Sequence, residues 1–156
     1  IKSLRYAGTV NKEIVVDADL NHKIDSLQAM ILLEQLKLLK KKIKKRISNA
    51  SFYEKRLTNK IRKPKFFSDS RHVYYTYSIL VDNRDNLIKY LNKNGIETKI
   101  QHPLIISDHP GLKNKFNKNF SNARKIANKI LSIPIHEKLK FNELNFIVKK
   151  INKFFN

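Results

Sequence analysis

The sequence predicts an α+β fold in which a long N-terminal helix accompanies a small sheet covered by helices. Residues 24–59 contain neither Gly nor Pro, and apolar side chains recur there at helical spacing. Further along, short runs of β-branched and aromatic residues alternate with shorter helical stretches. The 156 residues are an ordinary length for one domain, and such a chain can bury roughly two thirds of its unfolded surface.

The long helix follows an irregular segment, residues 1–23, in which Gly8 supplies a turn. We expect Asp19 or Asn21 to cap the helix. Its first half, residues 24–39, is apolar around most of its circumference and is expected to be widely buried. From Lys40 onward the apolar stripe narrows and the outer face is basic. The pattern predicts one helix over 24–59, or two helices with a bend near residues 39–41.

The rest of the chain predicts strands and helices in turn. Residues 72–81 predict a strand in which Tyr75 and Tyr77 share one face and Tyr74 lies on the other. A helix around residues 87–91 ends at Asn94-Gly95. Residues 96–100 predict a second strand, parallel or mixed with the first. A loop over 103–120, a helix over 123–130, an extended segment over 132–135 and a final helix over 144–155 complete the chain.

The composition excludes several classes of protein. The chain has no Cys and only three Gly, which excludes disulfide frameworks, Cys-ligated metals and Gly-rich nucleotide loops. A formal net charge of +20 raises the expectation of an anionic partner, but 26 of the 33 basic residues are Lys and they are spread along the chain. This even spread favours solvated faces over a nucleic-acid interface. No apolar run approaches the roughly 18 residues of a membrane helix.

The five histidines supply no recognisable catalytic or metal-binding pattern. They are scattered, and no two stand at the i, i+4 spacing of a helical zinc site. His102 precedes a proline in a loop, where functional side chains are frequent. From these patterns alone, the sequence predicts a basic α+β domain without a metal site and without an assigned activity.

A series of short motifs resembles the DegT/DnrJ/EryC1/StrS family of sugar aminotransferases. Residues 4–8 read L-R-Y-A-G and residues 20–29 read L-N-H-K-I-D-S-L-Q-A, similar to the family's "L-R-x-x-G" and "N-x-R-hydrophobic-D-x-hydrophobic-Q-A-A". The later matches follow in the family's order: Gln35-Leu36, Arg46, Tyr53, Leu57, then residues 72–77, 83–85, 95–98, 101–103 and 131–134. Arg46 and Tyr53 are expected to be structural.

The resemblance implies a fold and an architecture. Members of this family resemble aspartate aminotransferase, with a large N-terminal α/β domain whose lysine binds pyridoxal 5'-phosphate as a Schiff base. By this resemblance, residues 1–23 lead out of that large domain and residues 24–156 form the small C-terminal domain of a type I fold. No lysine of this chain stands in the family's Ser-x-x-x-x-Lys setting. We therefore expect the cofactor to be held mainly by the N-terminal domain, and the chain alone to be inactive.

The resemblance also implies site residues, none of them catalytic. Asn21 matches the asparagine that reaches the cofactor phosphate of the partner subunit. Four residues are implied at the substrate side: Lys23, Tyr75, Gln101 and His102. Lys23 stands where Arg is usual, Tyr75 replaces a common His, and Gln101-His102 departs from His-Tyr, so the sugar is left open.

The implied protein is a cytoplasmic homodimer with shared active sites. It transfers an amino group, with glutamate as the expected donor, to a keto-sugar carried on a nucleotide, as in polysaccharide biosynthesis. Three alternatives stay open: a sugar dehydratase of the same family, a basic nucleic-acid-binding module, and a stand-alone interaction domain.

Overall fold

The computed structural model describes the chain except residues 1, 12, 18–22, 66–68, 113–114 and 116–118. It divides into two compact units, residues 1–40 and 41–156, and the helix α2 (Ser26–Arg56) contributes to both. Each unit is considered by itself. No described helix is long and apolar enough to cross a membrane.

The first unit contains a short helix and a hairpin. The helix α1 (Lys2–Arg5) leads to β1 (Thr9–Val10), which pairs antiparallel with β2 (Ile14–Val15). Gly8 supplies the expected turn, with a φ of 71°. Its carbonyl accepts hydrogen bonds from the backbone N–H groups of Val16 and Asp17.

The helix α2 begins later than the sequence predicts, because Asp25 caps it. The Asp25 carboxylate accepts hydrogen bonds from the backbone N–H groups of Leu27, at 2.8 Å, and Gln28, at 3.3 Å. The two helix caps predicted from the sequence, Asp19 and Asn21, lie outside the described residues. The helix continues without a break to Arg56, so the prediction of one long helix is the one that the structure follows.

The expectation that the first half of α2 is widely buried was wrong. The apolar side chains from Ile24 to Leu39 are exposed, among them Leu27 at 60% and Leu33 at 62%. The described core residues all lie between Ala50 and Ile151, in the second unit.

The second unit is built on a small antiparallel sheet. The strand β3 (Tyr77–Leu80) pairs with β4 (Ile130–Ile133), and Tyr77 lies opposite Ile133. Isolated bridges extend both edges, joining Arg62 to Leu80 and Lys99 to Ser132. The segment 96–100 is therefore a single bridge to β4 and not the predicted second strand. Since β3 and the segment 96–100 both pair antiparallel with β4, these two segments run parallel to each other on opposite sides of β4, which agrees with the expected parallel or mixed unit.

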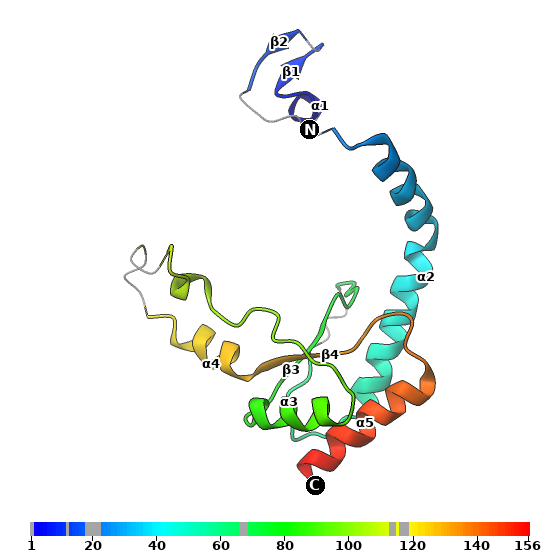
Figure 1. Cartoon of the computed structure of the whole chain (residues 1–156), viewed down its shortest axis with the longest axis vertical. Coiled ribbons are helices and arrows are strands. Elements are labelled where there is room, and N and C mark those ends of the chain that lie inside the picture. Colours follow the sequence, from blue (N-terminus) through cyan, green and yellow to red (C-terminus); the bar gives the residue numbers. More distant parts are fainter. Residues whose placement is uncertain (1, 12, 18–22, 66–68, 113–114, 116–118) are drawn as a thin grey trace. The chain divides into compact units, whose positions relative to one another are not determined.

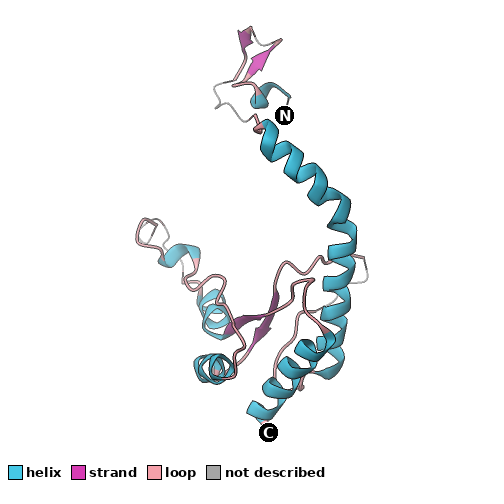
Figure 2. Ribbon diagram, turned by 45° about the vertical axis from the view of Figure 1, so that its right-hand side comes forward, coloured by secondary structure: helices cyan, strands magenta, loops and turns pink. Residues whose placement is uncertain are grey.

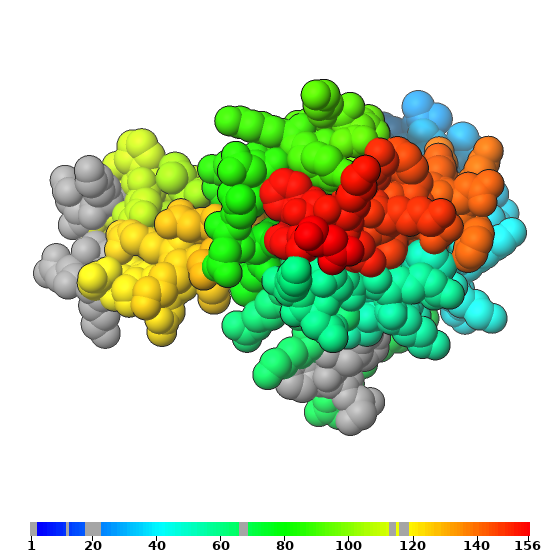
Figure 3. All heavy atoms as spheres, turned by 90° about the horizontal axis from the view of Figure 1, so that it is seen from below, coloured from blue at the N-terminus to red at the C-terminus, as the bar shows by residue number. Residues whose placement is uncertain are grey.

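Helices cover this sheet. The helix α3 (Arg84–Lys93) runs beside α5 (Phe141–Phe155), and both lie below the strands in Figures 1 and 2. Seen from below, α5 is flanked by α3 and by the C-terminal part of α2 (Figure 3). The short helix η1 (Ile106–Asp108) interrupts the predicted loop, and α4 (Ser121–Lys129) precedes β4. The predicted arrangement of a long helix with a small, helix-covered sheet is thus confirmed.

Candidate functional site

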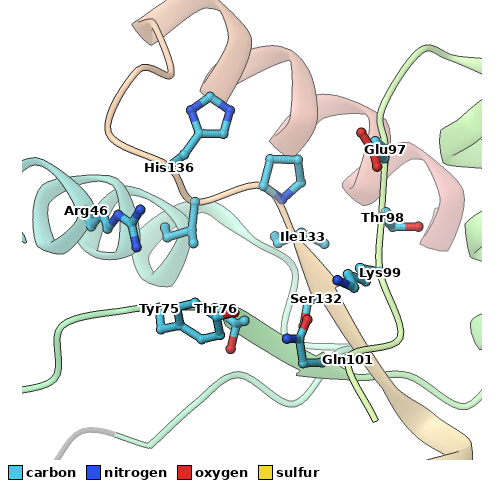
Figure 4. A pocket seen from close by; sticks show the side chains of 12 residues that line it. Arg46, Tyr75, Thr76, Glu97, Thr98, Lys99, Gln101, Ser132, Ile133 and His136 are labelled. Atoms are coloured by element: carbon cyan, nitrogen blue, oxygen red, sulfur yellow. The ribbon is translucent and has the colours of Figure 1, made fainter. Parts of the chain in front are cut away.

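Two of the predicted site residues meet at one cavity of the second unit. Tyr75 and Gln101 line an open cavity of about 330 Å³ between the start of β3, the end of β4 and the segment 97–101. Arg46 of α2 and His136 also line it (Figure 4). The other predicted residues lie elsewhere. Lys23 belongs to the first unit, where its ammonium lies 4.8 Å from the centre of the Tyr6 ring. Asn21 lies outside the described residues.

An unusual backbone conformation places Tyr75 at the cavity. Tyr74 has a φ of 49°, and its N–H donates a hydrogen bond of 2.9 Å to Nδ1 of His72. The regular strand begins only at Tyr77, so its alternation does not extend back to Tyr75. Tyr74 and Tyr77 are both buried, while Tyr75 is 73% exposed. The prediction that Tyr75 and Tyr77 share a face was wrong, since it assumed a regular strand from residue 72.

Three side chains of α2 bind the segment 134–137, which forms one wall of the cavity. The Tyr53 hydroxyl donates to the Pro134 carbonyl at 2.8 Å, and the Asn49 amide donates to the His136 carbonyl at 3.0 Å. The Arg46 guanidinium binds Oε2 of Glu137 through Nε, at 3.1 Å, and Nη2, at 3.0 Å. Positions 46, 49 and 53 share one face of α2, so their side chains all reach the segment 134–137. Arg46 and Tyr53 have the structural role expected of them.

The Glu137 carboxylate is stabilised in its charged form. A backbone hydrogen bond within Glu137 is the largest cause that lowers its pKa, and the Arg46 guanidinium lowers it further, while partial burial opposes both. Since the Arg46 charge is compensated by this carboxylate, it adds little net positive charge to the cavity.

The opposite wall comes from the segment 97–101. Lys99 exchanges two backbone hydrogen bonds with Ser132, at 3.0 and 2.9 Å, which fixes this segment against β4. Lys99 and Gln101, which are two positions apart in this extended segment, both line the cavity. Figure 4 shows Gln101 directed toward the space between this wall and Tyr75. The sequence analysis did not predict Lys99 as a residue of this cavity. Its position two residues before Gln101 could have indicated it.

His102 lines a different, apolar cavity of about 790 Å³. This cavity lies between the loop around η1 and α4, and its walls are mainly aliphatic, with Ile105, Ile126 and Ile130 among them. Arg124 of α4 closes the loop by pairing with Asp108 of η1, and this pairing raises the Arg124 pKa. The predicted substrate residues Gln101 and His102 are therefore neighbours in sequence that face two different cavities.

The described residues show neither a buried lysine nor a cluster of metal ligands. A lysine that holds this cofactor needs a sheltered position, and no lysine in the described part of the chain is buried. Among the same residues, no group of three His, Asp or Glu side chains is placed to bind a metal ion. The cavity lined by Tyr75 and Gln101, called the polar cavity below, offers hydrogen-bond donors and the Lys99 ammonium beside the Glu97 carboxylate and several apolar side chains.

The sequence profile of the DegT/DnrJ/EryC1/StrS aminotransferase family matches residues 1–152. The chain belongs to this family. One relative of the chain, the pleiotropic regulatory protein of Geobacillus stearothermophilus, is 28% identical over 141 residues, which are 86% of this chain and 38% of the relative. Another, the dTDP-3-amino-3,6-dideoxy-alpha-D-galactopyranose transaminase of Aneurinibacillus thermoaerophilus, is 25% identical over 97% of this chain and 42% of its own length.

Solved structures share the fold of this chain. DesV of S. venezuelae, solved in complex with a ketimine intermediate, superposes with a TM-score of 0.90 at 23% identity, over 98% of this chain and 42% of DesV. NtdA of Bacillus subtilis, solved with bound cofactor PMP, gives a TM-score of 0.82 at 23% identity, over 96% of this chain and 37% of NtdA. The chain thus spans well under half the length of these relatives.

Proposed function

We propose that this chain is the C-terminal part of a pyridoxal-phosphate-dependent nucleotide-sugar aminotransferase. The observation that carries the proposal is the family match over residues 1–152, joined to a polar cavity that brings Tyr75 and Gln101 together. The reaction is transfer of an amino group, with glutamate as donor, to a keto-sugar on a nucleotide, within polysaccharide biosynthesis in the cytoplasm. The cofactor supplies the electron sink for this chemistry.

Within this proposal, the second unit binds substrate and does not hold the cofactor. The phenol of Tyr75 and the amide of Gln101 provide hydrogen bonds for sugar hydroxyl or phosphate oxygens. His102 stays a predicted substrate residue of this proposal, at the separate apolar cavity that it lines.

The proposed assembly is a homodimer with shared active sites. Asn21 and Lys23 are assigned to the partner's active site, where an amide donor would bind the cofactor phosphate and a cation would lie near the nucleotide-sugar phosphates. Residues 1–23 lead out of the large domain, and residues 24–156 form the small domain.

The test uses the protein expressed from the complete reading frame that encodes this chain. We expect pyridoxal phosphate absorbance in the purified protein, and glutamate-dependent formation of an amino sugar from a nucleotide-linked keto-sugar. Tyr75→Phe and Gln101→Ala are expected to raise KM about tenfold each while the cofactor absorbance is unchanged. Loss of a sugar hydroxyl without consumption of glutamate would replace this function by the dehydratase alternative.

The 156-residue chain is the matched control. It is expected to bind no pyridoxal phosphate and to have no aminotransferase activity, since its described residues offer no buried lysine. Activity of this chain by itself would contradict the division of labour proposed here.

A further inference from the structure

Lys99 presents an uncompensated positive charge at the polar cavity. Its backbone is fixed by the two hydrogen bonds to Ser132, so the side chain leaves the sheet edge at a defined place. Figure 4 shows this side chain on the wall that also carries Gln101. Within the part of the chain that the structure describes, no acidic group lies within 4 Å of its ammonium.

The other charged groups that line the cavity form no ion pair with Lys99. Arg46 is held by Glu137 through two of its nitrogens and is locally neutral with it. Glu97 lines the same wall as Lys99 but forms no ion pair with it. An anion that binds here is therefore drawn to the Lys99 and Gln101 end of the wall and kept away from Glu97.

Two neutral polar groups complete the arrangement. The Gln101 amide carries two donors, and the exposed Tyr75 phenol carries one. No hydrogen bond of either side chain is found among the described residues, so both are available to a ligand. A charged donor beside two neutral donors suits an oxyanion, because hydrogen bonds to a charged acceptor are about twice as strong as neutral ones.

We propose that Lys99, Gln101 and Tyr75 form an anion-binding subsite that takes a phosphate or carboxylate group of the substrate. The inference rests on the proposed function, because it assigns the anion to a nucleotide sugar. Its two sources are the diphosphate of the nucleotide and a carboxylate on the sugar ring. Lys99 contributes a point charge, and Gln101 with Tyr75 fixes the orientation of the bound oxygens.

The experiment is a nuclear magnetic resonance titration of the ¹⁵N-labelled 156-residue chain at low salt. The probes are UDP, UDP-glucose and UDP-glucuronate. We expect shifts at Lys99, Gln101 and Tyr75, an apparent affinity about tenfold weaker in Lys99→Met, and weaker binding as salt is added. The matched control is Lys89→Met, since Lys89 is an exposed lysine of α3 that lines neither cavity. It is expected to bind like the parent chain.

The probes separate the two sources of the anion. If UDP alone binds, and binds more weakly to the Lys99→Met chain, the anion is the diphosphate. If UDP-glucuronate binds but UDP and UDP-glucose do not, the anion is the carboxylate. No shift at these residues with any probe, or equal affinity of the Lys99→Met and parent chains, overturns the subsite. Because Lys99 is exposed, its variant is expected to unfold at the parent's midpoint, which is checked first.

The aminotransferase assay of the complete protein is a separate measurement. If that protein is active and the titration shows no Lys99 dependence, the subsite fails and the proposed function stands. If the anion binds through Lys99 and the complete protein does not transfer amino groups, the proposed function fails and the subsite stands.

Discussion

At the scale of single residues, buried tyrosines join α2 to the sheet. The Tyr53 ring centre lies 5.2 Å from that of Tyr77, which lies 6.0 Å from that of Tyr74. All three side chains are buried, and the Tyr53 hydroxyl is bonded to the Pro134 carbonyl. This cluster connects the core to the wall of the polar cavity, so its hydroxyl groups affect both stability and the site.

Tyr53→Phe tests the hydrogen bond to Pro134. The substitution keeps the ring but leaves a carbonyl without its donor, so the free energy of unfolding is expected to fall by about 1–2 kcal/mol. Urea unfolding followed by circular dichroism measures the change. Tyr75→Phe removes a hydroxyl at an exposed position and is expected to cost less than about 0.5 kcal/mol. Equal costs for the two variants would show that the Tyr53 hydrogen bond adds no stability.

Tyr77→Phe tests the dependence of stability on alkaline pH. Burial, and then the charge and hydrogen bond of Glu54, raise the Tyr77 pKa in the folded chain. The unfolded chain therefore loses this proton first, near pH 10, and stability is complete below that pH and falls as the pH rises above it. Removing the group is expected to make the decline between about pH 10 and 12 shallower. An unchanged slope in urea unfolding across this range would contradict the assignment.

At the scale of elements, the sequence predicted most helices well and the strands less well. Helical spacing and Asn94-Gly95 located α3, because those signals are local. The strand over 72–81 was predicted too long because the left-handed backbone at Tyr74 has no local signature in an aromatic run. Lys99 pairs with Ser132, more than 30 positions away. The residues 96–100 alone therefore could not identify the strand with which this segment pairs. The placement of Gln101 and His102 in separate cavities depends on the same long-range pairing.

Gly95 follows the end of α3 and has a left-handed backbone conformation, which other residues adopt only at a cost in free energy. Its φ is 73°, and a Cβ added there would meet no atom within 4 Å, so the cost of Gly95→Ala is conformational and not steric. We expect a loss of about 1 kcal/mol in the free energy of unfolding, measured in urea. Gly111→Ala is the matched control, since that site is equally open and lacks a positive φ. A similar loss at both positions would mean that φ is not the cause.

At the scale of the whole molecule, stability is expected to reside in the second unit. The described core residues all lie at position 50 or later, so the described part of residues 1–40 contributes no buried apolar cluster. A chain of residues 41–156 is therefore expected to unfold cooperatively, within about 1 kcal/mol of the full chain. Urea unfolding of both chains measures this difference. A truncated chain without a cooperative transition would show that residues 1–40 are needed for the fold.

The first unit instead exposes apolar surface that water disfavours. Leu32 and Leu36, one helical turn apart on α2, are 52% and 59% exposed. Contiguous apolar surface of this kind drives association, so the full chain alone is expected to self-associate as its concentration rises, while residues 41–156 are not. Leu32→Glu with Leu36→Glu is expected to lower the mean mass measured by sedimentation velocity. Val73→Glu with Ile106→Glu adds the same charge outside residues 1–40 and is expected to leave the association in place. A full chain that stays monomeric at every concentration would refute the assignment of this surface to self-association.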